Sequence, residues 1–162
     1  MKNKTLIDIF KLLASIIVCQ LAGLIGSIFT VTAIPTWYAA LQKPAFNPPN
    51  WIFAPVWTSL YLLMGISAFI IWRKGLSSSG VKEALIVFVV QLILNASWSI
   101  VFFGLKSPLS GAVVIIILWI AILFTVVRFF KISMTASLLL LPYLLWVSFA
   151  AVLNISIWLL NT

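Results

Sequence analysis

The sequence predicts an all-α integral membrane protein, a single domain over residues 1–162 built as a five-transmembrane-helix bundle. Five stretches without a charged residue make up most of the chain, at 12–42, 44–72, 84–105, 107–127 and 132–162. Each one reaches the roughly 20 residues that an α-helix needs to cross the hydrocarbon core of a bilayer. With 64% hydrophobic and 7% charged residues and a mean hydropathy of +1.26, the chain carries more apolar surface than a soluble fold can bury.

The segments between the charges and turn residues define the expected elements. We expect helices over residues 6–33, 51–73, 81–104, 108–128 and 133–159. Ser107 before Pro108 is typical of a helix start, because a serine oxygen caps the free N–H groups of the first turn and proline fits that turn. Strands of a membrane barrel would alternate in polarity, and residues 113–122 do not.

The connection between the first two helices, residues 35–50, differs from the other loops because it is rich in proline and aromatic residues. Residues 37–41 can form a short helical turn, whereas the prolines at 44, 48 and 49 force extended backbone before them. A semi-rigid loop of this length in a compact bundle is usually functional, which favours a lid. The alternative is an interfacial anchor, since Trp and Tyr favour the headgroup level of a membrane.

The cations indicate an orientation. Five crossings put two of the ten, Lys43 and Lys106, on the side opposite the N-terminus. The other eight fall on the N-terminal side, namely Lys2, Lys4, Lys11, Arg73, Lys74, Lys82, Arg128 and Lys131. Because cations of short loops concentrate on the cytoplasmic side, we expect the N-terminus to lie in the cytoplasm. We expect the protein to reside in the cell membrane. The cations are scattered singly between the helices, so the net charge of +8 does not predict nucleic-acid binding.

Ionisable residues are scarce inside the predicted helices. The chain has no histidine, its single cysteine is Cys19, and its only acids are Asp8 and Glu83, near helix ends. Such a composition predicts no cysteine-based metal site and no proton relay at mid-membrane depth. Hydrolytic or general acid–base chemistry is also not expected.

Aromatic and amide residues recur at helical spacing in three of the predicted helices, and each set shares one face. The sets are Phe53, Trp57, Tyr61 and Met64; Gln91, Asn95, Trp98 and Phe102; and Tyr143, Trp146, Ala150, Leu153 and Asn154. Uncharged amides within hydrocarbon must find partners, so we expect Gln91, Asn95 and Asn154 to face inward. Singly, each amide could serve only to join helices; together with the aromatic faces they favour a cavity for a flat, hydrophobic ligand.

Three blocks then resemble a known family. They are WYAALQKPAFNPPNWIFAPVWTSLYLLMG at 37–65, QLILNASW at 91–98 followed by FFG at 102–104, and PYLLWVSFA at 142–150 followed by LN at 153–154. Through these blocks, residues from about 20 to 158 resemble the TspO/MBR family, the translocator proteins, also called tryptophan-rich sensory proteins or peripheral-type benzodiazepine receptors.

The resemblance implies a five-helix bundle whose first loop partly covers a ligand pocket. Family members bind porphyrins, haem-like tetrapyrroles and synthetic isoquinoline or benzodiazepine ligands there. Carried over by motif and by shared face, the ligand-binding candidates are Trp57, Asn95, Trp146, Ala150, Gln91, Trp98, Tyr61, Phe53 and Phe149. The candidate lid and rim residues are Trp37, Tyr38, Lys43, Pro44, Pro48, Pro49 and Trp51.

Three classes of function follow from this resemblance. The first is a membrane receptor, sensor or carrier that binds porphyrin, haem or another planar hydrophobic ligand and needs no cofactor. The second is an enzyme that degrades porphyrin in light with Trp57 and Trp146, a chemistry that requires no acid or base. The third is a structural or partner-modulating membrane protein. Steroid transport is not expected, because residues 153–160 lack the Tyr and the cation of the cholesterol-recognition pattern.

Membrane lipid and a second copy of the chain are the remaining expected partners. The first helix contains two small-residue pairs four positions apart, Ala22 with Gly26 and Gly23 with Ser27. Such pairs allow helices to approach closely. They predict either close packing within the chain or, as the alternative, a homodimer.

Overall fold

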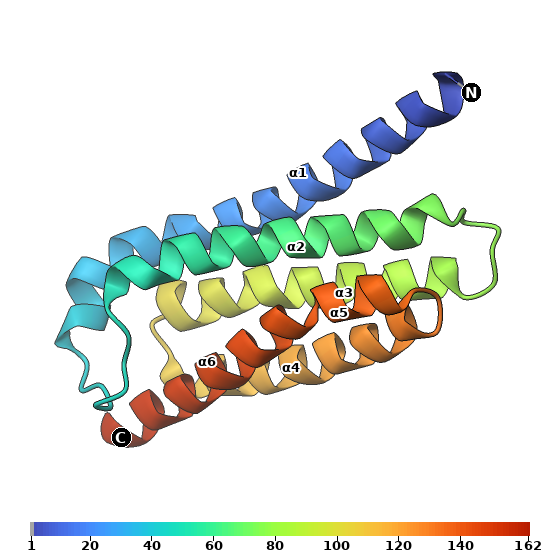
Figure 1. Ribbon diagram of the computed structural model, residues 1–162. Coiled ribbons are helices and arrows are strands. Elements are labelled where there is room, and N and C mark those ends of the chain that lie inside the picture. Colours follow the sequence, from blue (N-terminus) through green and yellow to red (C-terminus); the bar gives the residue numbers. More distant parts are fainter. Residues whose placement is uncertain (1) are drawn as a thin grey trace.

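The computed structural model of the protein describes residues 2–162, with side chains from Lys4 onward. Five helical segments in this part are long and apolar enough to cross a membrane, which confirms the predicted five-helix bundle. They are Lys4–Tyr38, Asn50–Arg73, Val81–Gly104, Pro108–Phe130 and Met134–Leu160. Figure 1 shows them running roughly side by side, with the connection after the first helix next to the C-terminus.

The first helix is longer than the sequence predicted. α1 covers Lys2–Ala33, and a π-helical turn over Ile34–Tyr38 extends it. Pro35 lies in this turn, where its missing N–H and its ring disturb the regular α-helical pattern; a wider turn accommodates such a residue. The segment around Trp37 and Tyr38 therefore continues α1 instead of forming a separate turn within the loop.

The next three spans begin and end close to the expected residues. α2 (Phe53–Arg73) follows a 3₁₀ turn at Asn50–Ile52. α3 (Val81–Ser99) continues into a second π-helical turn at Ile100–Gly104. α4 (Pro108–Phe130) has the predicted cap, because the Ser107 hydroxyl oxygen accepts a hydrogen bond of 3.3 Å from the backbone N–H of Ser110.

The fifth span is not the single helix expected over residues 133–159. It consists of α5 (Met134–Leu139) and α6 (Leu141–Leu160), which meet at Leu140. The cause is Pro142, which has no N–H to bond the carbonyl of Leu138 and whose ring crowds that turn. The expectation of an unbroken helix was therefore wrong, although the two pieces together still make one crossing.

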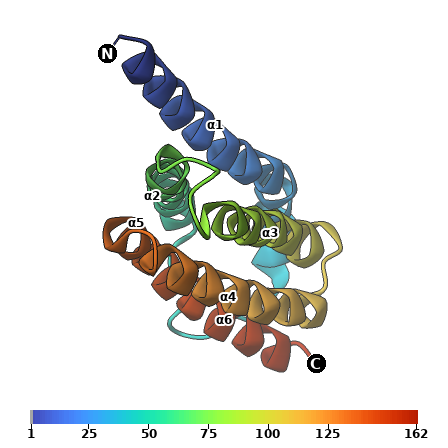
Figure 2. The same ribbon diagram turned by 90° about the vertical axis from the view of Figure 1, so that its right-hand side faces the viewer.

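Close helix packing depends on glycines at the α1 contacts, and Figure 2 shows α1 lying alongside α2 and α3. A Cβ atom added at Gly65 of α2 would lie 2.7 Å from the Cα atom of Ile16 on α1. On α1 itself, Gly23 faces the ring of Tyr61, and a Cβ at Gly26 would lie 2.9 Å from the Ser99 hydroxyl oxygen. These small residues thus pack within the chain, and a homodimer remains a prediction.

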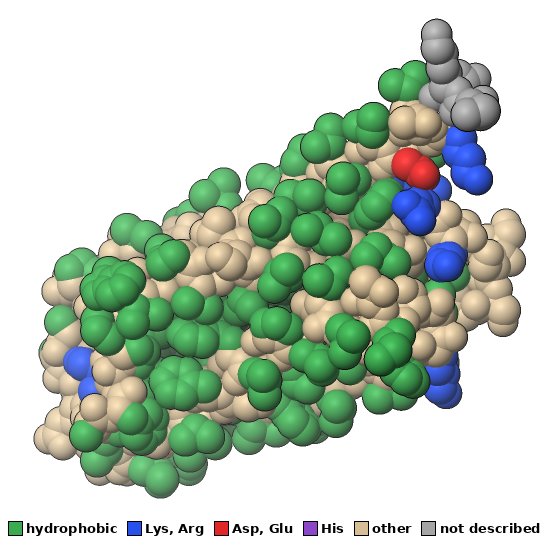
Figure 3. All heavy atoms as spheres, in the orientation of Figure 1, with side chains coloured by type: hydrophobic (Ala, Val, Ile, Leu, Met, Phe, Trp, Pro, Cys, Tyr) green, Lys and Arg blue, Asp and Glu red, His purple; other side chains and the backbone are tan. Residues whose placement is uncertain are grey.

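The surface has the charge distribution that the topology requires. In Figure 3 hydrophobic side chains cover the middle of the molecule, and Lys and Arg lie at its two ends. The end next to the N-terminus holds most of them. Of the eight cations assigned to that side, only the side chain of Lys2 lies outside the described residues.

Candidate functional site

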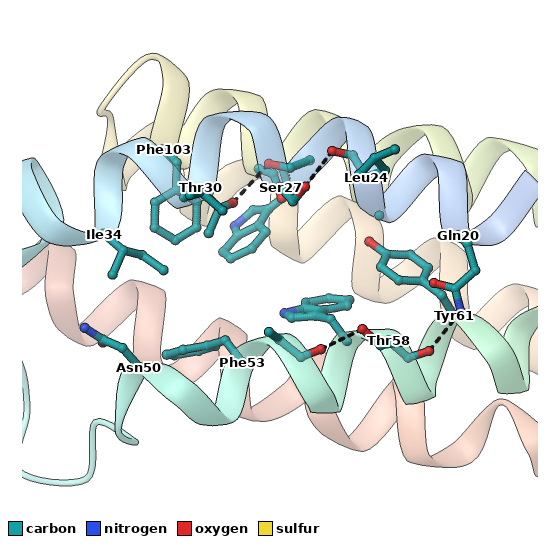
Figure 4. A pocket seen from close by; sticks show the side chains of 17 residues that line it. Gln20, Leu24, Ser27, Thr30, Ile34, Asn50, Phe53, Thr58, Tyr61 and Phe103 are labelled. Carbon is teal, nitrogen blue, oxygen red and sulfur yellow. Dashed lines mark hydrogen bonds between the residues drawn. The ribbon is translucent and has the colours of Figure 1, made fainter.

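A cavity of about 320 Å³ lies between α1 and α2 and is also lined by Trp98, Ser99 and Phe103 of α3 and of the π-helical turn after it. Figure 4 shows it in the gap between these two helices, with Gln20 and Thr58 toward one end and Ile34 and Asn50 toward the other. The Gln20 Nε2 atom donates a hydrogen bond of 3.1 Å to the backbone carbonyl of Thr58 and joins the two helices there. Four predicted ligand-binding residues line this cavity: Phe53, Trp57, Tyr61 and Trp98.

A smaller cavity of about 30 Å³ lies among α2, α3 and α6. It brings together Trp57, Trp146 and Ala150, three of the four residues that the family motifs placed around a pocket; the fourth, Asn95, does not line it. Its volume is enough for about one water molecule. The residues Phe53, Trp57, Trp98 and Phe103 line both cavities and so form the wall between them.

Ring contacts hold this wall in place. The Trp57 ring is inclined by 30° to that of Trp98, with the two centroids 6.5 Å apart, and its centroid lies 5.6 Å from that of Tyr61. The indole Nε1 atom of Trp98 donates a 3.0 Å hydrogen bond to the Asn154 Oδ1 atom, while Asn154 Nδ2 donates to the Pro108 carbonyl at 2.8 Å. Asn154 is buried, so the expectation that it faces inward is confirmed, and its role is to fix Trp98.

Asn95 and Gln91 also face inward, but they line neither cavity. Asn95 accepts a hydrogen bond from the Tyr61 hydroxyl and donates one of 3.0 Å to the Tyr143 hydroxyl. Tyr143 in turn donates to the Gln91 Oε1 atom at 2.9 Å. This chain joins α2, α3 and α6, and within the described residues the Gln91 Nε2 atom has no partner. In this conformation Asn95 therefore connects helices.

The predicted lid is firmly attached to the bundle. The Trp37 ring lies 5.5 Å from that of Phe102, and the Tyr38 ring 5.8 Å from that of Phe103. The Tyr38 hydroxyl donates a 2.7 Å hydrogen bond to the Asn47 Oδ1 atom, which holds the loop against the end of α1. Tyr38 also lines the smaller cavity, and Asn50 the larger one.

The remaining lid and rim candidates lie farther from the cavities. Trp51 is 74% exposed and, like the prolines at 44, 48 and 49, lines neither cavity. The Lys43 ammonium donates to the carbonyls of Tyr38, Ala39 and Leu41, so it caps the end of the first helix. Phe149 lines neither cavity as well; its ring lies 5.5 Å from that of Trp146.

The α1 side of the larger cavity was not predicted. It is lined by Gln20, Gly23, Leu24, Gly26, Ser27, Thr30, Val31 and Ile34. A signal was present, because Gln20, Gly23, Ser27 and Thr30 recur at spacings of three and four in an otherwise apolar helix and so share one face. The cysteine and acids of the described residues form no group of three or more that could hold a metal ion.

Comparison with known proteins agrees with this architecture. The model of the TspO/MBR family matches residues 15–159. The tryptophan-rich protein TspO of Archaeoglobus fulgidus is 51% identical over 155 residues, 95% of this chain and 99% of that protein. The tryptophan-rich protein TspO of Chlorobaculum tepidum is 44% identical over 95% of this chain and 98% of that protein. The human translocator protein is 35% identical over 86% of this chain and 83% of that protein. With its five spans, the chain is an integral multi-pass membrane protein and belongs to the TspO/MBR family.

Proposed function

We propose that the protein is a membrane receptor or carrier for a planar hydrophobic ligand of the porphyrin type. The observation that carries this proposal is the cavity of about 320 Å³ between α1 and α2, walled by the indole rings of Trp57 and Trp98. Its volume lies within the range of roughly 300–1,000 Å³ typical of small-molecule sites. Flat aromatic walls favour stacking on a flat ligand.

The arrangement of the two cavities suggests how a macrocycle binds. The larger cavity is near the lower end of that size range, and only the shared aromatic wall separates it from the smaller cavity beside Trp146 and Ala150. A macrocycle that displaces the Trp57 ring reaches both cavities, so Trp57 contacts it from one side and Trp146 from the other. The names "sensory protein" and "translocator protein" of relatives fit a receptor or carrier.

A titration with protoporphyrin tests the proposal. Protoporphyrin added to the full chain in lipid nanodiscs should quench the tryptophan fluorescence of the protein, and the quenching should saturate. Trp57→Ala should weaken binding at least about tenfold, since it removes most of a stacking surface. Trp72→Ala is the matched control, because Trp72 lies near the other end of α2 and lines neither cavity. Equal affinity in the native chain and in both Trp57→Ala and Trp146→Ala, with the fold intact, would place the ligand elsewhere.

The second candidate function is light-dependent degradation of porphyrin. It is favoured by one observation: Trp57 and Trp146, the two tryptophans that would take part, line the same small cavity. Illumination of the bound pigment should then bleach its absorbance faster than in empty nanodiscs. A protein with Trp57→Phe and Trp146→Phe that binds porphyrin but no longer accelerates bleaching would support an enzyme, whereas unchanged bleaching would argue against it.

The orientation and the partners belong to the same proposal. For a protein of the cell membrane, the eight-to-two division of the cations favours an N-terminus in the cytoplasm.

The proposed partners are membrane lipid around the bundle and a second copy of the chain. A homodimer would have to use surfaces other than Gly23 and Gly26, which face Tyr61 and Ser99. A modulatory role toward another membrane protein would be supported by a partner that binds equally well with and without porphyrin.

A further inference from the structure

We infer that the end of α4 binds an anionic phospholipid, whose phosphate pairs with Arg128 and Lys131 while an acyl chain lies along the helix face beneath them. The inference goes beyond the proposed function, because neither residue lines either cavity. It follows from the position of the two cations, from the aromatic ring under Arg128, and from the apolar residues that continue the same face of α4.

The two cations lie where lipid headgroups meet the protein. α4 ends at Phe130, so Arg128 is in its last turn and Lys131 is its C-terminal cap. Figure 1 places this turn at the end of the bundle opposite the C-terminus, the end at which most of the Lys and Arg of Figure 3 lie. Residues three positions apart share one face of a helix, and both side chains are exposed. Within the described residues neither side chain makes a hydrogen bond or an ion pair, so both cations are free to bind one anionic group.

The Phe124 ring holds the guanidinium of Arg128. The Arg128 Cζ atom lies 4.7 Å from the ring centroid of Phe124, which is one turn nearer the middle of the membrane. A guanidinium over an aromatic ring contacts it through its planar face. The N–H groups in that plane stay available, and their fork matches two oxygens of a phosphate. The ring thus holds Arg128 in place without using its donors.

From the cations inward, α4 presents a continuous apolar face to the lipid. Its members recur at spacings of three and four residues, and each is 45–57% exposed: Val113, Ile117, Ile120, Phe124 and Val127. From residue 113 to residue 127 the face is about 21 Å long, which exceeds the roughly 15 Å of hydrocarbon in one leaflet. An acyl chain of the leaflet next to Arg128 can therefore lie along this face over its whole depth.

Charges near the site favour an anion. The start of α3 lies beside the end of α4, since a Cβ atom at Gly80 would lie 4.0 Å from the Ile132 side chain. Residues 80–84 and 128–132 together carry three cations against one acid, Glu83. This surplus of positive charge attracts a headgroup with a net negative charge. With the N-terminus in the cytoplasm, this end meets the cytoplasmic leaflet, whose anionic lipids supply such a headgroup.

Cations at the C-terminus of a helix also offset the helix dipole. That contribution stabilises α4 equally in every lipid, so it predicts no preference among headgroups. Binding of a phosphatidylglycerol headgroup, which carries a net negative charge, does predict one. Phosphatidylcholine has the same phosphate, but its choline cation is repelled by Arg128 and Lys131. The preference for an anionic over a zwitterionic headgroup is therefore the property to measure.

Phosphatidylglycerol and phosphatidylcholine with the same acyl chains provide the test. Each is titrated into the full chain in a non-ionic detergent, and native mass spectrometry counts the lipid molecules that stay bound. Phosphatidylglycerol should bind at least about tenfold more tightly, because two basic side chains attract it. Equal binding of the two lipids would overturn the inference. So would complete displacement of phosphatidylglycerol by inorganic phosphate at constant ionic strength, which would show a site for the free anion.

Three variants assign the preference to residues. Arg128→Gln together with Lys131→Gln should reduce the affinity for phosphatidylglycerol to that for phosphatidylcholine. Phe124→Leu, which keeps an apolar side chain but removes the ring, should lower it about threefold. Lys106→Gln is the matched control, because Lys106 is an exposed cation at the opposite end of α4, and it should change neither affinity. A double variant that retains the preference would place the lipid at other cations and overturn the inference. A dimer that the double variant abolishes would assign this face to a second copy of the chain and overturn it as well.

A crosslinking experiment on the native chain needs no variant to fold. A phosphatidylglycerol analogue with a photoactivatable diazirine in one acyl chain should react mainly with peptides covering residues 113–131. The corresponding phosphatidylcholine analogue should react there much less. Crosslinks spread evenly over all five spans, or equal for the two analogues, would overturn the inference. Porphyrin binding is not involved, so such a result would leave the proposed function intact.

Discussion

Asn161 holds Gln42 by two reciprocal hydrogen bonds between residues 119 positions apart. Its Oδ1 atom accepts from the Gln42 backbone N–H at 3.0 Å, and its Nδ2 atom donates to the Gln42 carbonyl at 2.9 Å. The side-chain amide of Asn161 thus bonds both backbone groups of Gln42, as a neighbouring strand of main chain would. It fastens the proline-rich loop to the end of α6. The Phe46 ring, 6.2 Å from that of Phe149, makes a second contact between the same segments.

Replacing Asn161 by Ala should release the loop locally. Two exposed hydrogen bonds are worth about 1–2 kcal/mol together, so the backbone amide of Gln42 should exchange its hydrogen at least about fivefold faster. Hydrogen exchange followed by mass spectrometry on peptides covering residues 39–49 measures this change. Thr162→Ala is the control, because the Thr162 hydroxyl donates to the Leu159 carbonyl at the end of α6 and not to the loop. Unchanged exchange in Asn161→Ala would mean that other contacts alone hold the loop.

Replacing Asn95 by Leu should lower stability and leave ligand affinity nearly unchanged. The change removes the acceptor of the Tyr61 hydroxyl and the donor to the Tyr143 hydroxyl, both inside the bundle. Unsatisfied groups of this kind cost about 1–3 kcal/mol, which thermal unfolding in detergent should register. Porphyrin affinity should change by less than about threefold. A tenfold loss of affinity in a protein of native stability would instead assign the Asn95 amide to the ligand.

The fold was predictable because span length and charge placement are properties of the sequence alone. The uncharged stretches set five crossings, and Ser107 with Pro108 located the start of α4. The break at Leu140 was missed although Pro142 was visible, because the apolar stretch appeared continuous. The π-helical turn at Ile34–Tyr38 depends on how α1 packs, which the pattern of hydrophobic residues does not report.

The site was predictable only in part, for a physical reason. Aromatic residues at helical spacing identified the faces that carry Trp57, Trp98 and Trp146. Whether an inward amide meets a ligand or another helix depends on the partners across the bundle, so the hydrogen bonds of Asn95 were not foreseeable. The α1 wall was missed because Gly23 and Ser27 were interpreted as packing residues, whereas glycines that allow close contact also border the cavity.

The orientation leads to a labelling prediction. Single cysteines at Asn47 and at Ser78, in a chain whose buried Cys19 is replaced by Ala, should react with an impermeant maleimide from opposite sides of the membrane. The reason is that one helix, α2, separates the two positions. With a cytoplasmic N-terminus, Asn47→Cys in intact cells should react and Ser78→Cys only after permeabilisation. The reverse pattern would invert the orientation, and labelling of both from one side would contradict a single crossing.

Close packing of α1 on α2 predicts unequal costs for two alanine substitutions. A Cβ at Gly65 would lie 2.7 Å from the backbone Cα of Ile16, whereas one at Gly104 would lie 2.8 Å from the side chain of Phe29. A ring can turn aside and a helix backbone cannot without moving the helix, so Gly65→Ala should cost about 1–3 kcal/mol of unfolding free energy. Gly104→Ala should cost less. Thermal unfolding compares the two, and equal melting temperatures would show that α1 shifts freely.

Enlarging Ala150 should distinguish large ligands from small ones. Leucine at this position fills the smaller cavity of about 30 Å³, so a macrocycle that extends past the Trp57 ring loses that space. Protoporphyrin affinity should fall about tenfold, or 1.4 kcal/mol, whereas a small flat ligand that fits within the larger cavity should lose less than about threefold.

Two variants complete this comparison. Val152→Leu enlarges an exposed residue of the same helix and should change neither affinity. Ser27→Leu projects into the larger cavity and should weaken both ligands. Equal losses for the two ligands in Ala150→Leu would mean that both already occupy the smaller cavity. No loss for either would confine the macrocycle to the space between α1 and α2 and remove Ala150 from the site.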